Sequence, residues 1–177
     1  SELGGGVGEF GQRAGIAVKM ITGDYAETAL AIANQVELNH TQEVLTGQEV
    51  LHLTKEELQE RVKRVNIYAR MFPEAKLKVI DALRENGEVV AMTGDGVNDG
   101  PALKAAHIGI AMGQRGSEVA KSAASLILTD DDLAHMTEAV ALGRKIYDNL
   151  KKAIQYIVSI HIPIILIVTL PLLLLWK

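Results

Sequence analysis

Acidic residues and glycines are concentrated in one short segment, "AMTGDGVNDGPALKAAHIGIAM" (Ala91–Met112). An apolar run leads into Thr93–Asp95, and Asp99 follows four residues after Asp95. A turn or a helix cap needs only one such aspartate, so the second favours a chemical role. Two hard carboxylates, with room for water and phosphate, suit Mg²⁺ better than zinc. From the spacing alone, a capped turn stays open as the alternative.

A second corner has the same pattern, because "MITGD" (Met20–Asp24) also ends an apolar run and precedes a helical pattern. In an open parallel sheet, ligands gather at the carboxyl ends of the strands, so we expect both corners on one sheet edge. The glycine turns, including Gly94, offer backbone N–H groups to an anion. Thr22 can add a hydroxyl donor and Lys76 a positive charge. These parts together predict a phosphoryl-transfer site. Taken singly, Thr22–Asp24 fits a helix N-cap equally well, and Lys76 a solvated helix lysine.

Apolar runs alternate with helical patterns along most of the chain, which predicts a parallel sheet with helices on both faces. Thr54, with Glu57 three residues later, is typical of a helix start. The acidic run 130–132 is expected to begin a further helix rather than to bind metal. The expected strands are 16–21, 65–69, 89–93, 108–112 and 126–128, and the expected helices are 27–36, 54–62, 73–86, 98–106 and 117–124.

The C-terminal segment 154–176 contains no Asp, Glu, Lys or Arg. About 20 apolar residues in a helix cross the hydrocarbon core of a bilayer. Basic residues precede this segment, so we expect that end to face the cytoplasm. Helical periodicity continues into it from Leu133, which predicts one helix for the stalk and the span. The alternative is a buried core helix. The basic residues are Arg144, Lys145, Lys151 and Lys152.

The bulk composition excludes several classes of protein. A length of 177 residues and a net charge of −4 fit one domain of ordinary size and argue against nucleic acid as a partner. With no cysteine, the chain has neither disulfides nor a thiol nucleophile. Residues 1–12 are rich in glycine but follow no strand, so we interpret them as a flexible lead-in rather than a dinucleotide site.

Several of these motifs, in this order, resemble P-type ATPases, the ion pumps that pass through an aspartyl-phosphate. "TGDGVNDGPAL" (Thr93–Leu103) is similar to the hinge motif of that family, and "MITGD" to its second phosphorylation-domain motif. "ARMFPEAKLKVI" (Ala69–Ile80) resembles its Arg-x-x-Pro-x-x-Lys segment, and "GRKIYDNLKKAIQYI" its stalk entering the fifth transmembrane helix. The resemblance covers 13–177 and is greatest to bacterial cation pumps related to calcium ATPases.

The resemblance implies a fold and a set of domains. Residues 13–132 would form a partial phosphorylation domain, an α/β haloacid-dehalogenase-like, Rossmann-type parallel sheet. Residues 133–153 would be the stalk helix and 154–176 the transmembrane helix. The implied location is a membrane, in particular the bacterial plasma membrane, with 1–150 on the cytoplasmic side. The implied partners are ATP, a transported cation, the bilayer and the remainder of the pump.

The resemblance also implies roles for individual residues. Asp95 would bind Mg²⁺, with Asp99 close behind it holding the metal and its water. Lys76 would neutralise the phosphate. Asn98 and Thr22 match residues that contact the phosphate. Gly23, Asp24 and Arg70 match positions that help to hold the nucleotide. Gly94 is expected to bind nucleotide or phosphate.

Two departures from the family pattern qualify the resemblance. The nucleophile segment Asp-Lys-Thr-Gly-Thr, which forms the central strand, occurs nowhere in the 177 residues. We therefore expect a piece of a pump that is inactive alone, and either poorly stable or closed up across the missing strand. In the span, His161 and Ile164 stand where calcium pumps have Asn and Glu. His161 then lies on the ion path or bonds between helices, and both readings stay open.

Two other functions are alternatives to a pump segment. One is a non-catalytic, membrane-tethered haloacid-dehalogenase-like module that binds nucleotide or a partner. The other is a soluble phosphatase of the same superfamily, against which the membrane span and the stalk argue.

Overall fold

The computed structural model describes residues 15–38, 43–132 and 134–173. The chain divides into two units, Ser1–Asp132 and Leu133–Lys177. The predicted lead-in 1–12 lies outside the described residues.

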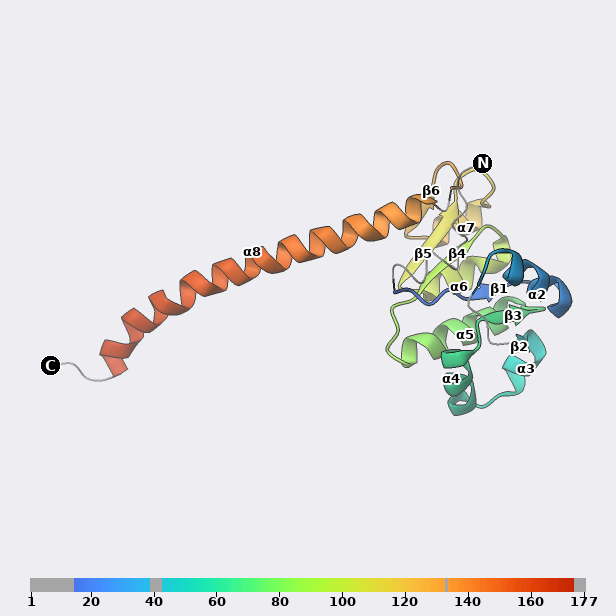
Figure 1. Cartoon of the computed structure of the whole chain (residues 1–177), viewed down its shortest axis with the longest axis horizontal. Helices are drawn as coiled ribbons and strands as arrows, with labels where there is room; N and C mark the ends of the chain where they lie inside the picture. Colours follow the sequence, from blue (N-terminus) through green and yellow to red (C-terminus); the bar gives the residue numbers. More distant parts are fainter. Residues whose placement is uncertain (1–14, 39–42, 133, 174–177) are drawn as a thin grey trace. The chain divides into compact units, whose positions relative to one another are not determined.

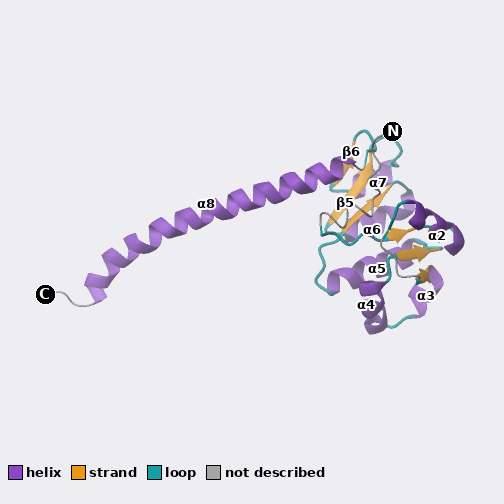
Figure 2. Cartoon of the chain, in the orientation of Figure 1, coloured by secondary structure: helices purple, strands orange, loops and turns teal. Residues whose placement is uncertain are grey.

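The described residues of the first unit form six parallel strands in two sheets, shown as separate groups of arrows in Figure 2. One sheet has the order β1-β3-β2, with β1 at Met20–Ile21, β3 at Ile67–Ala69 and β2 at Val44–Thr46. The other has the order β4-β5-β6, with β4 at Ala91–Gly94, β5 at Ile108–Met112 and β6 at Leu126–Leu128. The predicted α/β fold with parallel strands is confirmed.

Helices connect the strands (Figure 1). They are α2 (Ala26–Gln35), α3 (Gly47–His52), α4 (Lys55–Arg64), α5 (Pro73–Glu85), the 3₁₀ turn η1 (Val97–Asp99), α6 (Gly100–Ala105) and α7 (Glu118–Ala123). Most lie within one or two residues of the predicted ranges, but β2 and α3 were not predicted. Thr54 caps α4 as predicted, since its hydroxyl accepts from the Glu57 N–H while the Glu57 carboxylate accepts from the Thr54 N–H.

Helix α5 contributes to two of the three apolar clusters formed by the described residues of this unit. Its Val79 packs with Leu45, Leu58 and Tyr68 in the core beside the first sheet. The next residue, Ile80, belongs to a second cluster with buried residues of β4, β5, α6 and α7, namely Met92, Ala102, Leu103, Ala111 and Ala120. The start of α5 therefore has a fixed position beside η1, with which it also makes contact.

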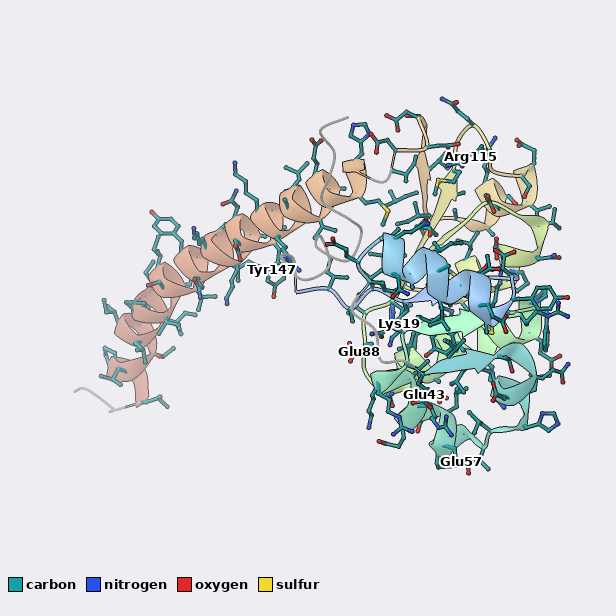
Figure 3. The ribbon with its side chains drawn as sticks, turned by 45° about the vertical axis from the view of Figure 1, so that its right-hand side comes forward. Lys19, Glu43, Glu57, Glu88, Arg115 and Tyr147 are labelled. Carbon is teal, nitrogen blue, oxygen red and sulfur yellow. The ribbon has the colours of Figure 1, made fainter. Side chains whose placement is uncertain are left out.

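Strands β1 and β4 are edge strands, because each has one neighbour among the described strands. The alternative in which the flanking strands close up across the missing strand is therefore not what these residues adopt. Strand β1 is short and is tied to the start of β3 by Lys19, whose ammonium donates to Val65 O at 2.7 Å and Asn66 Oδ1 at 2.9 Å. Burial lowers the pKa of Lys19, and the nearby Glu88 opposes that effect (Figure 3).

The second unit is the helix α8, which runs without a break over Ala134–Leu173. This confirms one continuous helix from the stalk into the apolar segment. Its part Glu138–Pro171 is long and apolar enough to cross a membrane, judged by length and composition. Pro163 and Pro171 lie inside it, and side chains such as Tyr147 point away from its axis (Figure 3).

Candidate functional site

Asp99 is the buried carboxylate of the site, with 8% of its surface exposed. Its Oδ1 lies 2.6 Å from the Lys76 ammonium, which reaches it from the first turn of α5. Its Oδ2 accepts the Gly96 N–H at 3.2 Å. Both oxygens therefore have a partner. The positive charge of Lys76 offsets the cost of burying the Asp99 carboxylate away from water.

Gly94 makes room for this carboxylate at the end of β4. A Cβ atom at that position would lie 2.7 Å from the Asp99 Cβ and 3.1 Å from its Oδ2. Contacts that close do not occur between real Cβ atoms and their neighbours, so any other residue here displaces Asp99. Packing against Asp99 is therefore the reason for glycine at this position.

Asp95 differs from Asp99 because its side chain is exposed. Its backbone is held in place, since Asp95 O accepts the Ser117 N–H at 2.8 Å. Ser117 is itself the N-cap of α7, and its Oγ accepts the Ala120 N–H at 3.2 Å. Asn98 is also exposed, in η1 between the two aspartates. The loop after β4 thus offers one open carboxylate on a fixed backbone.

The other predicted corner, Thr22–Asp24, follows β1 and forms a local turn. Thr22 Oγ1 lies 3.1 Å from Asp24 Oδ2 and accepts the Asp24 N–H at 3.1 Å. The Thr22 backbone N–H donates to Tyr68 O in β3 at 2.9 Å, and Thr22 O accepts from the N–H of Met71, which follows β3, at 2.9 Å. Gly23 is exposed in the same turn.

Arg70 joins this corner from the end of β3. Its backbone has φ of 51°, the left-handed region, and its N–H donates to Asp24 O at 2.8 Å. Its guanidinium carbon lies 4.5 Å from the centroid of the Tyr25 ring. The sequence gives Tyr25 and Ser117 no motif of their own, so neither was among the predicted site residues.

The predicted site residues therefore form two groups. Lys76, Gly94 and Asp99 meet beside the exposed Asp95, while Thr22, Asp24 and Arg70 meet at the other corner. Within the described ranges, no hydrogen bond or ion pair links Thr22 to Lys76 or Asp95. The expectation that both corners share one sheet edge was wrong in detail, because β1 and β4 belong to different sheets.

A protein-family model for haloacid dehalogenase-like hydrolases matches residues 9–107. That range is more than half of the chain. The chain belongs to this hydrolase family.

Comparison with individual curated proteins indicates which kind of protein in this family the chain is similar to. Calcium-transporting ATPase 1 of Lactococcus lactis is 51% identical over 149 residues, which are 84% of this chain and 17% of that protein. Probable cation-transporting ATPase F of Mycobacterium tuberculosis is 53% identical over 148 residues, 81% of this chain and 16% of that protein. Human calcium-transporting ATPase type 2C member 2 is 48% identical over 157 residues, 88% of this chain and 17% of that protein. The chain is homologous to a segment of P-type cation-transporting ATPases and spans about a sixth of their length.

A solved structure supports the same fold. The catalytic domain of the CPx-ATPase CopB-B superposes with a TM-score of 0.56 at 24% sequence identity, covering 75% of this chain and 42% of that one. At this identity the likeness establishes the fold of the hydrolase family and nothing finer.

The carboxylates of Asp95 and Asp99 are the kind of ligand that a magnesium ion prefers. In the part of the chain that the structure describes, no three or more His, Cys, Asp or Glu side chains lie together so that they could hold a metal ion. A metal here would depend on Asp95 and Asp99, with water and phosphate oxygens filling the remaining positions. Mg²⁺ is typically bound in this way, through one or two carboxylates and substrate phosphates.

His161 lies in the apolar part of α8 and is exposed in this unit. Its Nδ1 is 2.8 Å from Ile157 O, one turn earlier in the same helix. If that nitrogen is the protonated one, Nε2 keeps its lone pair for another partner. Pro163, two residues later, has no N–H to donate within the helix.

Proposed function

We propose that this chain is the metal- and phosphate-binding part of a P-type ATPase phosphorylation domain, together with the stalk and transmembrane helix that follow it. The intact protein would couple ATP hydrolysis, through an aspartyl-phosphate, to cation transport across a membrane. In this proposal 13–132 is the partial domain, 133–153 the stalk and 154–176 the span. The observation that carries it is the buried Lys76–Asp99 pair beside the exposed Asp95 at the end of β4.

Each side chain of the site has a proposed role. Asp95 binds Mg²⁺ directly and Asp99 holds the metal and its water. Mg²⁺, when bound, supplies positive charge to the phosphoryl oxygens. Lys76 neutralises the phosphate, and Thr22 and Asn98 donate hydrogen bonds to it. The residues proposed to hold the nucleotide are Gly23, Asp24, Arg70 and Gly94.

The ion pair of Lys76 with Asp99 suggests how the site is kept ready. A lysine with 14% of its side chain exposed is expensive to bury unless a carboxylate faces it. Asp99 therefore holds the ammonium close to the end of β4 before any phosphate is present. An arriving phosphate then competes with Asp99 for a charge that is already in place, so little reorganisation is needed.

The chain by itself is expected not to accept a phosphoryl group, since its sequence contains no Asp-Lys-Thr-Gly-Thr segment. Incubation with γ-labelled ATP should leave no acid-stable label on the purified chain. A label that survives acid would overturn this expectation.

The test of the proposed site is magnesium-dependent binding, read residue by residue. We expect MgATP to shift the backbone amide NMR signals of Gly94 and Gly96 in the ¹⁵N-labelled chain held in detergent micelles. Asp95→Asn should abolish these shifts by removing the open carboxylate. Asp81→Asn is the matched control, because Asp81 is a half-exposed acid on α5 paired with Arg84 in the next turn. Shifts that persist in the Asp95→Asn variant would contradict the proposed metal role.

For the second unit we propose a location in the bacterial plasma membrane, with residues 1–150 on the cytoplasmic side. The basic residues before the apolar segment and the bacterial relatives support this orientation. His161 is the proposed ion-path residue, because an ionisable side chain within a span is costly unless it has a function.

A further inference from the structure

Arg70 adopts a backbone conformation that side chains with a Cβ atom rarely take. Of the residues that the structure describes, the non-glycine ones with positive φ are Glu37, Arg70 and Asp131. At Arg70 two backbone hydrogen bonds hold the conformation, from its own N–H to Asp24 O at 2.8 Å and from Met71 N–H to Thr22 O at 2.9 Å. The strained end of β3 is thereby fixed against the turn that follows β1.

This conformation brings the Arg70 guanidinium over the ring of Tyr25, with 4.5 Å between the guanidinium carbon and the ring centroid. Tyr25 is 64% exposed and stands at the N-cap of α2 without capping it through its side chain. A large exposed aromatic ring at this position has no packing role that explains it. In the described structure, the contact that this ring makes is with the Arg70 guanidinium.

Arg70 keeps its hydrogen-bonding capacity in this arrangement. Among the described residues no carboxylate forms an ion pair with it, and the nearby Asp24 carboxylate is engaged by the Thr22 hydroxyl. A guanidinium that stacks on a ring face uses its flat side and leaves its N–H groups, which lie in its plane, free for a ligand. The ring thus holds a positive charge in place without consuming its donors.

We propose that Tyr25 is a positioning residue, whose ring holds the Arg70 guanidinium ready for the phosphate chain of a nucleotide bound at the Thr22–Asp24 turn. The inference rests on the proposed function, because it takes a nucleotide as the ligand of this corner. Tyr25 itself acts through Arg70. An anionic ligand is the one that an arginine with free donors recognises best.

The test compares Tyr25→Leu with Tyr25→Phe in the 177-residue chain, because phenylalanine keeps the ring face and leucine removes it. Titration with MgATP, followed by the Arg70 side-chain Nε–Hε NMR signal, should give about two- to fivefold weaker binding for the leucine variant and unchanged binding for the phenylalanine variant. Loss of the ring-current shift of that signal in the leucine variant would show directly that the stack is gone.

Two further measurements separate positioning from a general structural effect. Adenosine, which has no phosphate, should bind the wild-type chain and both variants alike. In an Arg70→Gln background, Tyr25→Leu should have no additional effect, and this comparison keeps its meaning even if leucine loosens the turn. Equal weakening toward adenosine, or an undiminished effect of the leucine variant without Arg70, would overturn the inference.

The outcome also distinguishes this inference from the function on which it rests. A wild-type chain that shows no response to MgATP would remove the proposed nucleotide role and the inference together. A wild-type chain that binds MgATP, with Tyr25→Leu binding it equally well, would remove the inference alone.

Discussion

The two aspartates of the loop after β4 are of the same residue type but occupy different environments. Asp99 is buried, with Lys76 on one oxygen and the Gly96 N–H on the other, whereas Asp95 is exposed. A buried carboxylate needs its charge matched, and an exposed one does not. The Asp95 carboxylate is therefore open to solvent, whereas the Asp99 carboxylate is held by Lys76 and the Gly96 N–H.

Gly94 is the residue on which this organisation depends most directly. In Gly94→Ala the new Cβ would lie 2.7 Å from the Asp99 Cβ, with the rigid start of α6 behind it. Overpacking of this kind costs about 1–3 kcal/mol, so we expect the free energy of unfolding to fall by that amount. Urea unfolding of the chain in detergent micelles, followed by the NMR signals of β4 and β5, measures it.

Gly96→Ala is the matched control for this prediction. Gly96 lies in the same loop with φ of −93°, and its nearest contact to a new Cβ would be 3.5 Å, from Asp99 Oδ2. Both values are ordinary for alanine, so the stability of this variant should change little. Equal destabilisation by the two substitutions would mean that the loop responds to any loss of glycine and that the Asp99 contact is not the cause.

The motifs singled out residues that the structure brings together after β4, but not how those residues pair. Asp95, Asp99 and Lys76 were all singled out from residue type and spacing. The ion pair between Lys76 and Asp99 joins residues 23 apart and forms because α5 packs beside η1. That packing depends on the two cores that α5 shares, and no local pattern encodes it.

At the scale of the elements, α5 holds two other parts of the unit in place with lysines two positions apart. Lys76 reaches η1, whereas Lys78 reaches the C-terminal end of α3. The Lys78 ammonium donates to Val50 O and Leu51 O at 3.1 Å each and to Leu53 O at 2.8 Å. The last carbonyls of a helix lack partners within it, so a cation there satisfies them and complements the helix dipole.

We therefore expect Lys78→Met to destabilise the first unit by about 2 kcal/mol, because methionine keeps much of the apolar stem but cannot donate to the three carbonyls. Lys63→Met on α4 is the matched control, since among the described residues Lys63 pairs with Glu60 in the preceding turn and both side chains are more than half exposed. That control should cost a few tenths of a kcal/mol. Urea unfolding of both variants measures the difference, and similar costs would count against the role of Lys78.

Helix α3 also has a start that responds to pH. Glu49 accepts hydrogen bonds from the Thr46 hydroxyl and the Thr46 N–H, both at 2.7 Å, and these bonds lower the pKa of its carboxyl group. Because the folded-state pKa is depressed, this contribution to stability is present above the unfolded-state pKa and is lost as the pH falls through the folded-state value.

A carboxyl NMR titration of Thr46→Ala should show the pKa of Glu49 moving up toward the ordinary glutamate value. Glu57 serves as the internal control, because its pKa is lowered by the separate cap at Thr54 and should not respond. A Glu49 titration that is the same with and without the Thr46 hydroxyl would show that the side-chain bond is not the cause of the shift.

The helices and strands differ in how accurately the local sequence pattern predicted where they begin and end. Long helices with clear start signals, such as α4 with its capping box and α5 with Pro73 at its start, were predicted within about two residues. Strand β2 has three residues and was missed with α3, although Thr46 and Glu49 form a capping box that was visible in the sequence. Strand β1 was expected over 16–21 but pairs only at Met20–Ile21. Strand ends depend on the neighbouring strand, which no local pattern gives.

At the scale of the whole molecule, the described strands of the first unit form two sheets where the periodicity predicts one. Strand alternation was enough to predict parallel α/β topology, but pairing between strands is set by contacts far apart in sequence. The apolar helix α8 needed no such contacts to be predicted, because its length and composition suffice. The sheets leave β1 and β4 each with one open edge among the described strands.

Amide exchange measures whether these edges are open in solution. In a parallel strand, successive residues direct their N–H groups to opposite sides. Val90 O accepts the Ile108 N–H at 3.1 Å, so Val90 and Met92 face β5 while Ala91 and Thr93 face the open edge. We expect the amides of Ala91 and Thr93 to exchange at least about tenfold faster than the amide of Met92 between them.

Met92 is a control within the same strand, since local unfolding of β4 would expose all three amides equally and erase the difference. Alternate fast and slow exchange along β4 therefore requires a folded strand with one unpaired edge. Equal and slow exchange at Ala91, Met92 and Thr93 would mean that a strand covers this edge in solution. A dilution series then decides its source, because pairing between two copies weakens on dilution, whereas closure of β1 onto β4 within one chain does not.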